Sequence, residues 1–404
     1  MKKRRIITFI SIIIFIILII CLFYYFNLYE RIRLKIKGYS IKEQNIIINK
    51  VDNLNIIYKN NYIPELYDIL NNKDMKKNNI EKYISYYQKN NIEGNKVIFM
   101  VNNNLENEQY SDKLYNIITC ENYDKTNLEK YIDYINNYLN QDNYSCISVI
   151  TLAENDIKLE YNDELAELLK EKYFIKSNIN RYLDYKNKNN NLSNEDIIRN
   201  VNANIDYNFY TNIKSSDISK GKLMIVNKYY NLFSSYKGDL VETGNYSINS
   251  NYKMDREVFE AYKKLYEDAV KNNLHIKIRS AYRSYFDQQY IYNGYVARDG
   301  KAESDRYSAR AGHSEHQTGL AIDISAASDL WGDFSKTQEF TWMKDNSYKY
   351  GFILRYPKDK EYITGYMYEP WHYRYVGVDV AKYIYENNIT YDEYYAYFIE
   401  NKGE

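Results

Sequence analysis

The residues best suited to metal chemistry lie late in the chain, in the segment Ser314 to Asp323, SEHQTGLAID. His316 stands seven positions before Asp323 in a chain that has only four histidines. In the run LAIDIS, a period of two predicts a strand with Asp323 on one face and the apolar residues on the other. Gly319 allows a sharp turn before this strand. We therefore expect His316 to fold back over the face of Asp323, so that the two can share a metal ion.

A third ligand is available in the later segment EPWHYRY, where Glu369 stands three residues before His372. Pro370 cannot donate to a sheet ladder, so the segment should begin as a bend at the start of a strand. The bend allows Glu369 and His372 to face one cavity. Two histidines and one carboxylate, with a fourth position open to water, are the ligand set of a catalytic zinc site. Glu369 is then the expected general base.

Each of these residues also has a simpler interpretation. A single histidine is more often hydrogen-bonded in the core or at the surface, and we interpret His275 and His313 in that way. Asp323 on its own could pair with an arginine. The combination of His-x6-Asp on a strand with a later Glu-x-x-His favours a metal site.

The segments SAYRS, GHSEHQTGLAID and EPWHYRY, in that order, closely resemble the VanY-type D-alanyl-D-alanine carboxypeptidases of the M15 metallopeptidase family, which have the Hedgehog/DD-peptidase fold. The resemblance covers about residues 221–377. It implies an α+β catalytic domain with one zinc ion, held by His316, Asp323 and His372. It also implies that Glu369 is the catalytic acid/base.

The resemblance gives a role to SAYRSYFDQQ as well. Arg283 should bind the peptide carbonyl or the terminal carboxylate of the substrate near the metal, although an internal ion pair is the alternative for this residue. Other positions match residues that line the substrate pocket in such enzymes: Ser280, Gln288 and Ser314. The chain departs from the family at Ala281, where glycine is common, at Ala311, where proline is frequent, and in YKGDLV, which lacks an expected proline. These departures affect fine substrate geometry and remove no ligand.

The expected function is a zinc-dependent carboxypeptidase that removes the terminal D-alanine from peptidoglycan stem peptides. One alternative is an L,D-carboxypeptidase acting on tetrapeptides with the same zinc ligands. Another is a zinc-bearing protein that binds the cell wall without turnover. An intact Glu369 argues against a pure binder, because binding needs ligands but no base.

The N-terminal segment indicates a membrane anchor. Residues 6–26 carry no charge, and 21 residues in a helix would span about 30 Å, the thickness of a bilayer core. A cleavable signal peptide would have a shorter apolar stretch and a small-x-small cleavage site. The basic residues of 1–5 are matched by basic residues of 31–37, so charge alone does not orient the span. A peptidoglycan substrate places residues 1–5 in the cytoplasm and the catalytic domain outside the cell membrane.

Residues 27–205 contain three similar segments: NIEKYISY from Asn79, NLEKYIDY from Asn127 and NINRYLDY from Asn178. Their spacing predicts repeated helical hairpins or small α/β units that stack on their neighbours. The positions about 22 residues after each Asn should correspond to one another, which would align Val149 with Val101 and Val201. We favour a spacer over a ligand-binding array, and the region could also hold a partner protein.

Residues 206–395 form the expected catalytic domain, with an amphipathic helix from Val258 among short apolar strands. The chain carries 54 basic and 54 acidic residues. Such a balance, without a basic reader motif, argues against nucleic acid as a partner. Cys120 and Cys146 could form a disulfide or remain free.

Overall fold

A computed structural model describes residues 2–109 and 111–400 of the 404-residue chain. The chain divides into two compact units, Met1–Tyr161 and Asn162–Glu404. Within its described residues, the first unit has helices and turns but no strand, whereas the second combines helices with a four-stranded sheet. An α+β catalytic region preceded by a mainly helical region is the predicted fold class, and it is confirmed.

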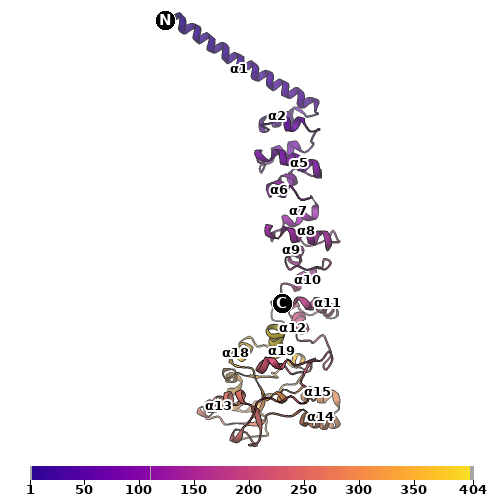
Figure 1. Cartoon of the computed structure of the whole chain (residues 1–404), viewed down its shortest axis with the longest axis vertical. Coiled ribbons are helices and arrows are strands. Elements are labelled where there is room, and N and C mark those ends of the chain that lie inside the picture. Colours follow the sequence, from indigo (N-terminus) through magenta and orange to yellow (C-terminus); the bar gives the residue numbers. More distant parts are fainter. Residues whose placement is uncertain (1, 110, 401–404) are drawn as a thin grey trace. The chain divides into compact units, whose positions relative to one another are not determined.

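The first unit begins with one long helix, α1 (Lys2–Ile36), which is straight along its length (Figure 1). Its stretch Thr8–Ile36 is long and apolar enough to cross a membrane, with a mean hydropathy of 3.0 in its most apolar window. Residues 6–26 lie wholly inside this helix. A signal sequence near an N-terminus can pass the same test of length and hydropathy, so α1 by itself establishes one apolar helix and no topology.

The remaining helices before the catalytic region follow a repeating order of short helix, 3-10 turn and two longer helices. In the first unit they are α2 (Ile41–Lys50), α3 (Asn55–Tyr58), α4 (Leu66–Asn71), η1 (Lys77–Asn79), α5 (Ile80–Asn90), α6 (Gly94–Asn102), α7 (Asp112–Ile118), η2 (Lys125–Asn127), α8 (Leu128–Asn137) and α9 (Cys146–Glu154). The third copy belongs to the second unit and comprises α10 (Asp163–Leu168), η3 (Lys176–Asn178), α11 (Ile179–Lys188) and α12 (Asn194–Asn202). The predicted segments from Asn79, Asn127 and Asn178 therefore open the first helix of a hairpin.

A buried tyrosine ties each hairpin together. Tyr83 accepts a hydrogen bond from the backbone N–H of Lys76 at 3.1 Å and donates to Oδ1 of Asn102 at 2.6 Å. The same pairing recurs as Tyr131 with Glu154 and Tyr182 with Asn202. Each acceptor is the last residue of a nine-residue helix, α6, α9 or α12.

This pairing corrects the register expected for the middle copy. Ala153, which precedes the acceptor Glu154, is the counterpart of Val101 and Val201, so Val149 lies one helical turn too early. The cause is a longer connection between α8 and α9, over residues 138–145. The Cys120–Cys146 disulfide, left open by the sequence, is formed and joins the end of α7 to the start of α9.

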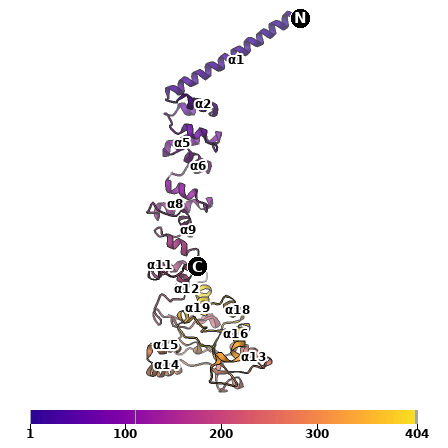
Figure 2. The same cartoon turned by 180° about the vertical axis from the view of Figure 1, so that it is seen from behind.

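The catalytic region contains two small strand pairs and one four-stranded antiparallel sheet with the order β5-β6-β8-β7. The strands are β1 (Lys214–Ser215), β2 (Tyr230–Asn231), β3 (Leu240–Glu242), β4 (Lys253–Asp255), β5 (Ile276–Ser280), β6 (Ala321–Ala326), β7 (Phe352–Leu354) and β8 (His372–Tyr375). The helices are η4 (Ile218–Leu223), η5 (Gly244–Tyr246), α13 (Arg256–Lys271), α14 (Tyr285–Asp299), α15 (Lys301–Tyr307), η6 (Glu315–Thr318), η7 (Phe334–Lys336), α16 (Gln338–Asn346), η8 (Ser347–Tyr350), α17 (Glu361–Thr364), α18 (Val378–Asn387), α19 (Tyr391–Tyr395) and the π-helical turn η9 (Ala396–Glu400). Helices α14 and α15 lie side by side, as Figure 2 shows from behind.

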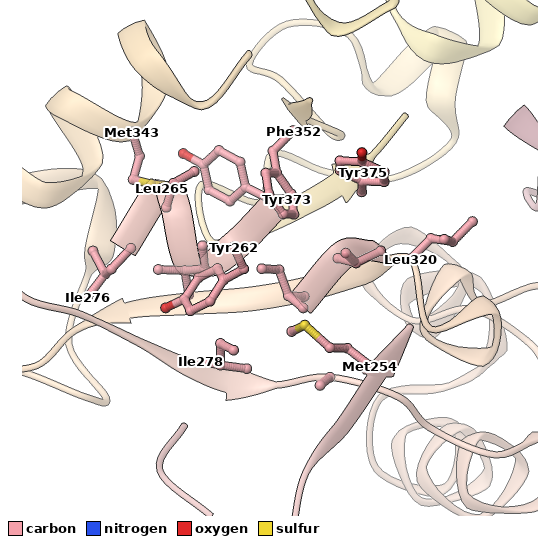
Figure 3. Packing of buried hydrophobic residues seen from close by; sticks show 14 of the residues in the cluster. Met254, Tyr262, Leu265, Ile276, Ile278, Leu320, Met343, Phe352, Tyr373 and Tyr375 are labelled. Atoms are coloured by element: carbon pink, nitrogen blue, oxygen red, sulfur yellow. The ribbon is translucent and has the colours of Figure 1, made fainter. Parts of the chain in front are cut away.

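The hydrophobic core of the catalytic region lies between α13 and one face of the sheet. Tyr262 and Leu265 of α13 are fully buried and lie near Ile276 and Ile278 of β5 (Figure 3). Complete burial of such a side chain stabilises the fold by about 1.5–3 kcal/mol. The helix expected from Val258 starts two residues earlier, because the side chain of Asp255 caps it. This packing fixes the strands that carry the functional residues.

Strand β6 separates the core from the functional face. Ile322 and Ile324 belong to the core, and Asp323 between them lines a cavity. The predicted alternation of this strand is therefore confirmed, and it determines which way the carboxylate of Asp323 points.

The third hairpin copy packs against the C-terminal end of the catalytic region. Tyr173 stacks on Tyr397, with ring centroids 3.9 Å apart and planes 1° from parallel. Its hydroxyl lies 3.3 Å from that of Tyr383. Arg181 of α11 forms a salt bridge with Asp206, just after the hairpin. Removing this copy would expose aromatic rings that the whole chain covers.

Candidate metal centre and active site

Three predicted ligands converge at the edge of the cavity. Ligand atoms of His316, Asp323 and His372 all lie within 4.8 Å of one another, and all three residues are buried. Oδ1 of Asp323 is 3.5 Å from Nε2 of His316 and 3.2 Å from Nδ1 of His372. Asp323 and His372 are directly opposite each other on the antiparallel strands β6 and β8. The sheet register therefore sets two ligands, and the turn before β6 supplies the third.

Gly319 shapes that turn. Its φ is +75°, in the left-handed region that favours glycine, and an added Cβ would lie 3.0 Å from the backbone nitrogen of Asp255. The turn brings Nδ1 of His316 to 2.7 Å from the carbonyl oxygen of Ala281. A carbonyl can only accept, so Nδ1 carries the proton and Nε2 is the free ligand atom. The expected sharp entry to the strand is confirmed.

His372 is fixed by a residue that the sequence did not reveal. Its Nε2 lies 3.3 Å from Oε2 of Glu315, a fully buried carboxylate. Glu315 in turn accepts hydrogen bonds from Arg355 at 2.8 Å and from Arg374 at 3.0 Å. Burial alone would raise the pKa of Glu315, but the two guanidinium groups hold that pKa well below its usual range. An ionised Glu315 leaves Nδ1 of His372 directed at Asp323, the arrangement of a carboxylate–histidine–metal triad.

The electrostatics of the ligands suit a cation. Burial alone would lower the pKa of His372, but hydrogen bonds to Asp323 and Glu315 outweigh it and raise the pKa to about 9. A positive charge is thus strongly favoured at this position. Burial keeps the pKa of His316 below its usual value, which leaves its imidazole neutral and able to bind a metal. Two imidazoles and one carboxylate fit zinc, with room for water as a fourth ligand.

Glu369 lies beside the ligands without being one of the converging three. Its Oε2 is 3.7 Å from Nδ1 of His372, and the residue precedes β8 across the turn formed by Pro370 and Trp371. Burial, together with the negative charge of Asp323, raises the pKa of Glu369 to about 7, while His372 opposes the shift. A carboxylate with such a pKa can accept and return a proton near neutral pH. Glu369 therefore stays the expected general base.

The cavity has a volume of about 500 Å³, and Arg283, Gln288 and Ser314 line it together with the three candidate ligands. Arg283 donates to Oε1 of Gln288 at 2.6 Å and to Oγ of Ser280 at 3.3 Å. Among the described residues, no carboxylate pairs with its guanidinium, so the internal ion pair considered for Arg283 is absent there. Arg283 is therefore held by neutral groups and keeps its charge available for a substrate.

Ser280, predicted to line the substrate pocket, lies next to Arg283. It is not among the cavity-lining residues in residues 2–109 and 111–400. Its backbone pairs with Asp323, and its hydroxyl accepts from Arg283 instead of facing a substrate. Ser280 thus supports Arg283 from behind.

The two remaining histidines have structural surroundings, as expected. Nδ1 of His313 lies 2.7 Å from the carbonyl oxygen of Asn227, and its ring meets the ring of Tyr210 edge-on. His275 is exposed, and its backbone N–H contacts Glu339.

Comparison with known proteins agrees with this geometry. The VanY family, described as D-alanyl-D-alanine carboxypeptidase, matches residues 251–378, which include every predicted site residue. A D-alanyl-D-alanine carboxypeptidase of Enterococcus faecalis (strain ATCC 700802 / V583) is 34% identical over 191 residues, covering 45% of this chain and 68% of the relative. This chain belongs to the VanY family. The helical hairpins precede the matched residues in the chain and lie outside the match.

Two further similarities cover the same part of the chain. The putative carboxypeptidase YodJ of Bacillus subtilis (strain 168) is 40% identical over 181 residues, which are 43% of this chain and 66% of the relative. The chain thus spans just under two thirds of the length of that relative. The solved structure of the LD-carboxypeptidase LdcB is 38% identical and matches with a TM-score of 0.43, over 46% of this chain and 91% of that one.

Proposed function

We propose that this protein is a zinc-dependent D-alanyl-D-alanine carboxypeptidase that removes the terminal D-alanine from peptidoglycan stem peptides. The observation that carries the proposal is the convergence of two histidines, one aspartate, a buried glutamate and an arginine held by neutral groups on one cavity. Its VanY-family relative in Enterococcus faecalis bears the name of this activity. One zinc ion per catalytic domain would be held by His316, Asp323 and His372.

The chain's own residues divide the work of hydrolysis. A bound zinc ion would supply Lewis acidity and lower the pKa of water to about 7. Glu369 accepts a proton from the attacking water and returns it to the amine of the leaving D-alanine. Arg283 orients the substrate by pairing its planar fork of donors with the terminal carboxylate. Because the oxygen nucleophile is water, no covalent enzyme intermediate is needed.

We further propose that α1 is an uncleaved anchor that crosses the cell membrane over residues 6–26, with residues 1–5 in the cytoplasm. The substrate lies outside that membrane, so the catalytic domain would be extracellular, and the hairpins of residues 27–205 would act as a spacer. A C-terminal tag on intact cells should then be accessible to added protease. Protection of the tag until the cells are lysed would contradict this orientation.

The test of the activity uses the whole chain in detergent, loaded with zinc. Release of D-alanine is followed from a pentapeptide ending in D-Ala-D-Ala and from the matching tetrapeptide, with Glu369→Gln as control. We expect release from the pentapeptide that the control abolishes. Release from the tetrapeptide alone would indicate an L,D-carboxypeptidase, and zinc binding without release from either would indicate a wall-binding protein.

A further inference from the structure

A second arginine in the cavity has no role in the reaction described above. Arg279 is the fourth residue of β5, where the pairing with β6 is irregular. Ile278 pairs with Ile324 and Ser280 pairs with Asp323, so Arg279 is the extra residue of a β-bulge. Bulges are common beside active sites, where they redirect a side chain. This one places Arg279 among the residues that line the cavity.

The guanidinium of Arg279 is held by aromatic rings and leaves its donors free. It lies 5.3 Å from the ring centroid of Trp371 and 6.0 Å from that of Trp331. Within the part of the chain that the structure describes, its side chain makes no hydrogen bond or ion pair. Stacking of this kind occupies the flat face of a guanidinium, whereas its N–H groups point outward in the plane. The rings therefore position Arg279 while its edge stays available to a planar anion.

Arg279 and Arg283 both carry a positive charge into the cavity. Asp323 is one of the three residues that would hold a zinc ion, and Glu369 lies beside them, 3.7 Å from His372. Glu315 is matched by two buried arginines outside the cavity lining. Among the described residues, neither arginine forms an ion pair: Arg283 contacts Gln288 and Ser280, and Arg279 faces aromatic rings. Glu369 lies in the same cavity lining, where burial raises its pKa and both arginines act to lower it. A substrate with a single carboxylate would satisfy only one of them.

We propose that Arg279 binds a second carboxylate of the substrate, carried by the residues that precede the C-terminal D-Ala-D-Ala. This inference rests on the proposed function and names its preferred substrate class, stem peptides with a free acidic group beside the scissile dipeptide. Arg283 takes the terminal carboxylate and Arg279 takes the second one. Stem peptides offer two such groups, the α-carboxylate of a γ-linked glutamate and the side-chain carboxylate of a diamino-dicarboxylic third residue.

The test compares three pentapeptides on the whole zinc-loaded chain: one with both carboxylates free, one amidated at the third residue, and one amidated at the glutamate. A charge-assisted hydrogen bond to one carboxylate corresponds to a preference of about 10- to 100-fold in kcat/KM. We expect one of the amidated peptides to lose that factor in the wild type. The amide that loses it identifies the carboxylate.

Arg279→Met should bring the ratio of kcat/KM for the free and amidated peptides close to one. Arg279→Lys should keep part of it, because a lysine retains the charge but not the fork. Lys264→Met removes an exposed charge of α13 outside the cavity lining and should leave the ratio unchanged. If Arg279→Met lowers kcat/KM equally for all three peptides, Arg279 has only a structural role and the inference is wrong.

A binding measurement separates this inference from the proposed activity. Dissociation constants of the same peptides are measured by calorimetry on the zinc-loaded Glu369→Gln chain, with and without Arg279→Met. A free-over-amidated preference that depends on Arg279 supports the inference even if the wild type releases no D-alanine. Equal affinities for all three peptides overturn it even if D-alanine is released.

Discussion

Replacing Glu315 by glutamine tests how the metal centre is supported. The substitution keeps the shape of the side chain but removes the charge that His372 and two arginines contact. Loss of a carboxylate behind a metal-binding histidine typically costs about 10–100-fold in metal affinity. We expect Glu315→Gln to weaken zinc binding by about that factor, because His372 loses the partner that fixes its ring.

The same substitution should destabilise the fold. Removing one partner of a buried ion pair costs about 3–5 kcal/mol, because the remaining charge is left uncompensated. Arg355 keeps Asp392 at 2.6 Å, and Arg374 keeps the carbonyl oxygen of Met224 at 2.7 Å. These remaining contacts place the expected loss at the lower end of that range.

Two assays separate these effects. Zinc affinity is measured by competition with a chelator on folded protein, and stability by urea unfolding of the metal-free chain. Glu303→Gln serves as the matched control, since Glu303 lies at the surface in an i,i+3 pair with Arg306. Its loss should cost less than about 1 kcal/mol and leave zinc affinity unchanged. Zinc affinity of Glu315→Gln equal to that of the control would refute the role assigned to Glu315.

Glu369, Gly319 and Lys228 give predictions that can be checked separately. Glu369→Gln should lower kcat by about 10²–10⁴-fold with zinc affinity retained, and loss of zinc would make this residue a ligand instead of the base. Gly319→Ala should cost about 1–2 kcal/mol of stability and weaken zinc binding, because the φ of this residue is +75°. The control Gly294→Ala in α14, where an added Cβ meets open space, should cost no stability. Equal effects of the two substitutions would be inconsistent with a strained turn at Gly319. Burial lowers the pKa of Lys228 from 10.5 to about 7, so the unfolded chain binds more protons between these pH values and stability rises with pH. Lys228→Met should therefore flatten the increase of the thermal midpoint between pH 7 and pH 9, and an unchanged slope would contradict this.

The convergence of His316, Asp323 and His372 was predictable because local patterns fix the directions of these side chains. Alternation along β6 sends Asp323 away from the core, and Gly319 marks the turn that returns His316. The bend at Pro370 accounts for Glu369 and His372 sharing one cavity. In each case neighbours in sequence determine the geometry.

Three features were not predicted, and the first of them, the contacts of Glu315, depends on residues far apart in the chain. In the sequence Glu315 is an ordinary charged residue. Its partners Arg355, directly after β7, and Arg374, in β8, lie 40 and 59 residues further along the chain. The hydrogen bond from Arg283 to the hydroxyl of Ser280 joins residues only three positions apart, but the spacing of the two residues does not reveal it. Similarly, the register of the second hairpin depends on a longer connection, which a fixed spacing cannot anticipate. The role of Glu315 follows from tertiary contacts and leaves no local signal in the sequence.

The central claim is that His316, Asp323 and His372 hold one zinc ion. The most direct measurement is anomalous diffraction at the zinc edge from crystals of the zinc-loaded chain. The account predicts one strong peak per chain, between Nε2 of His316, Oδ1 of Asp323 and Nδ1 of His372, and its loss in His316→Ala. A zinc peak elsewhere in the chain, or none at these three atoms, would contradict it.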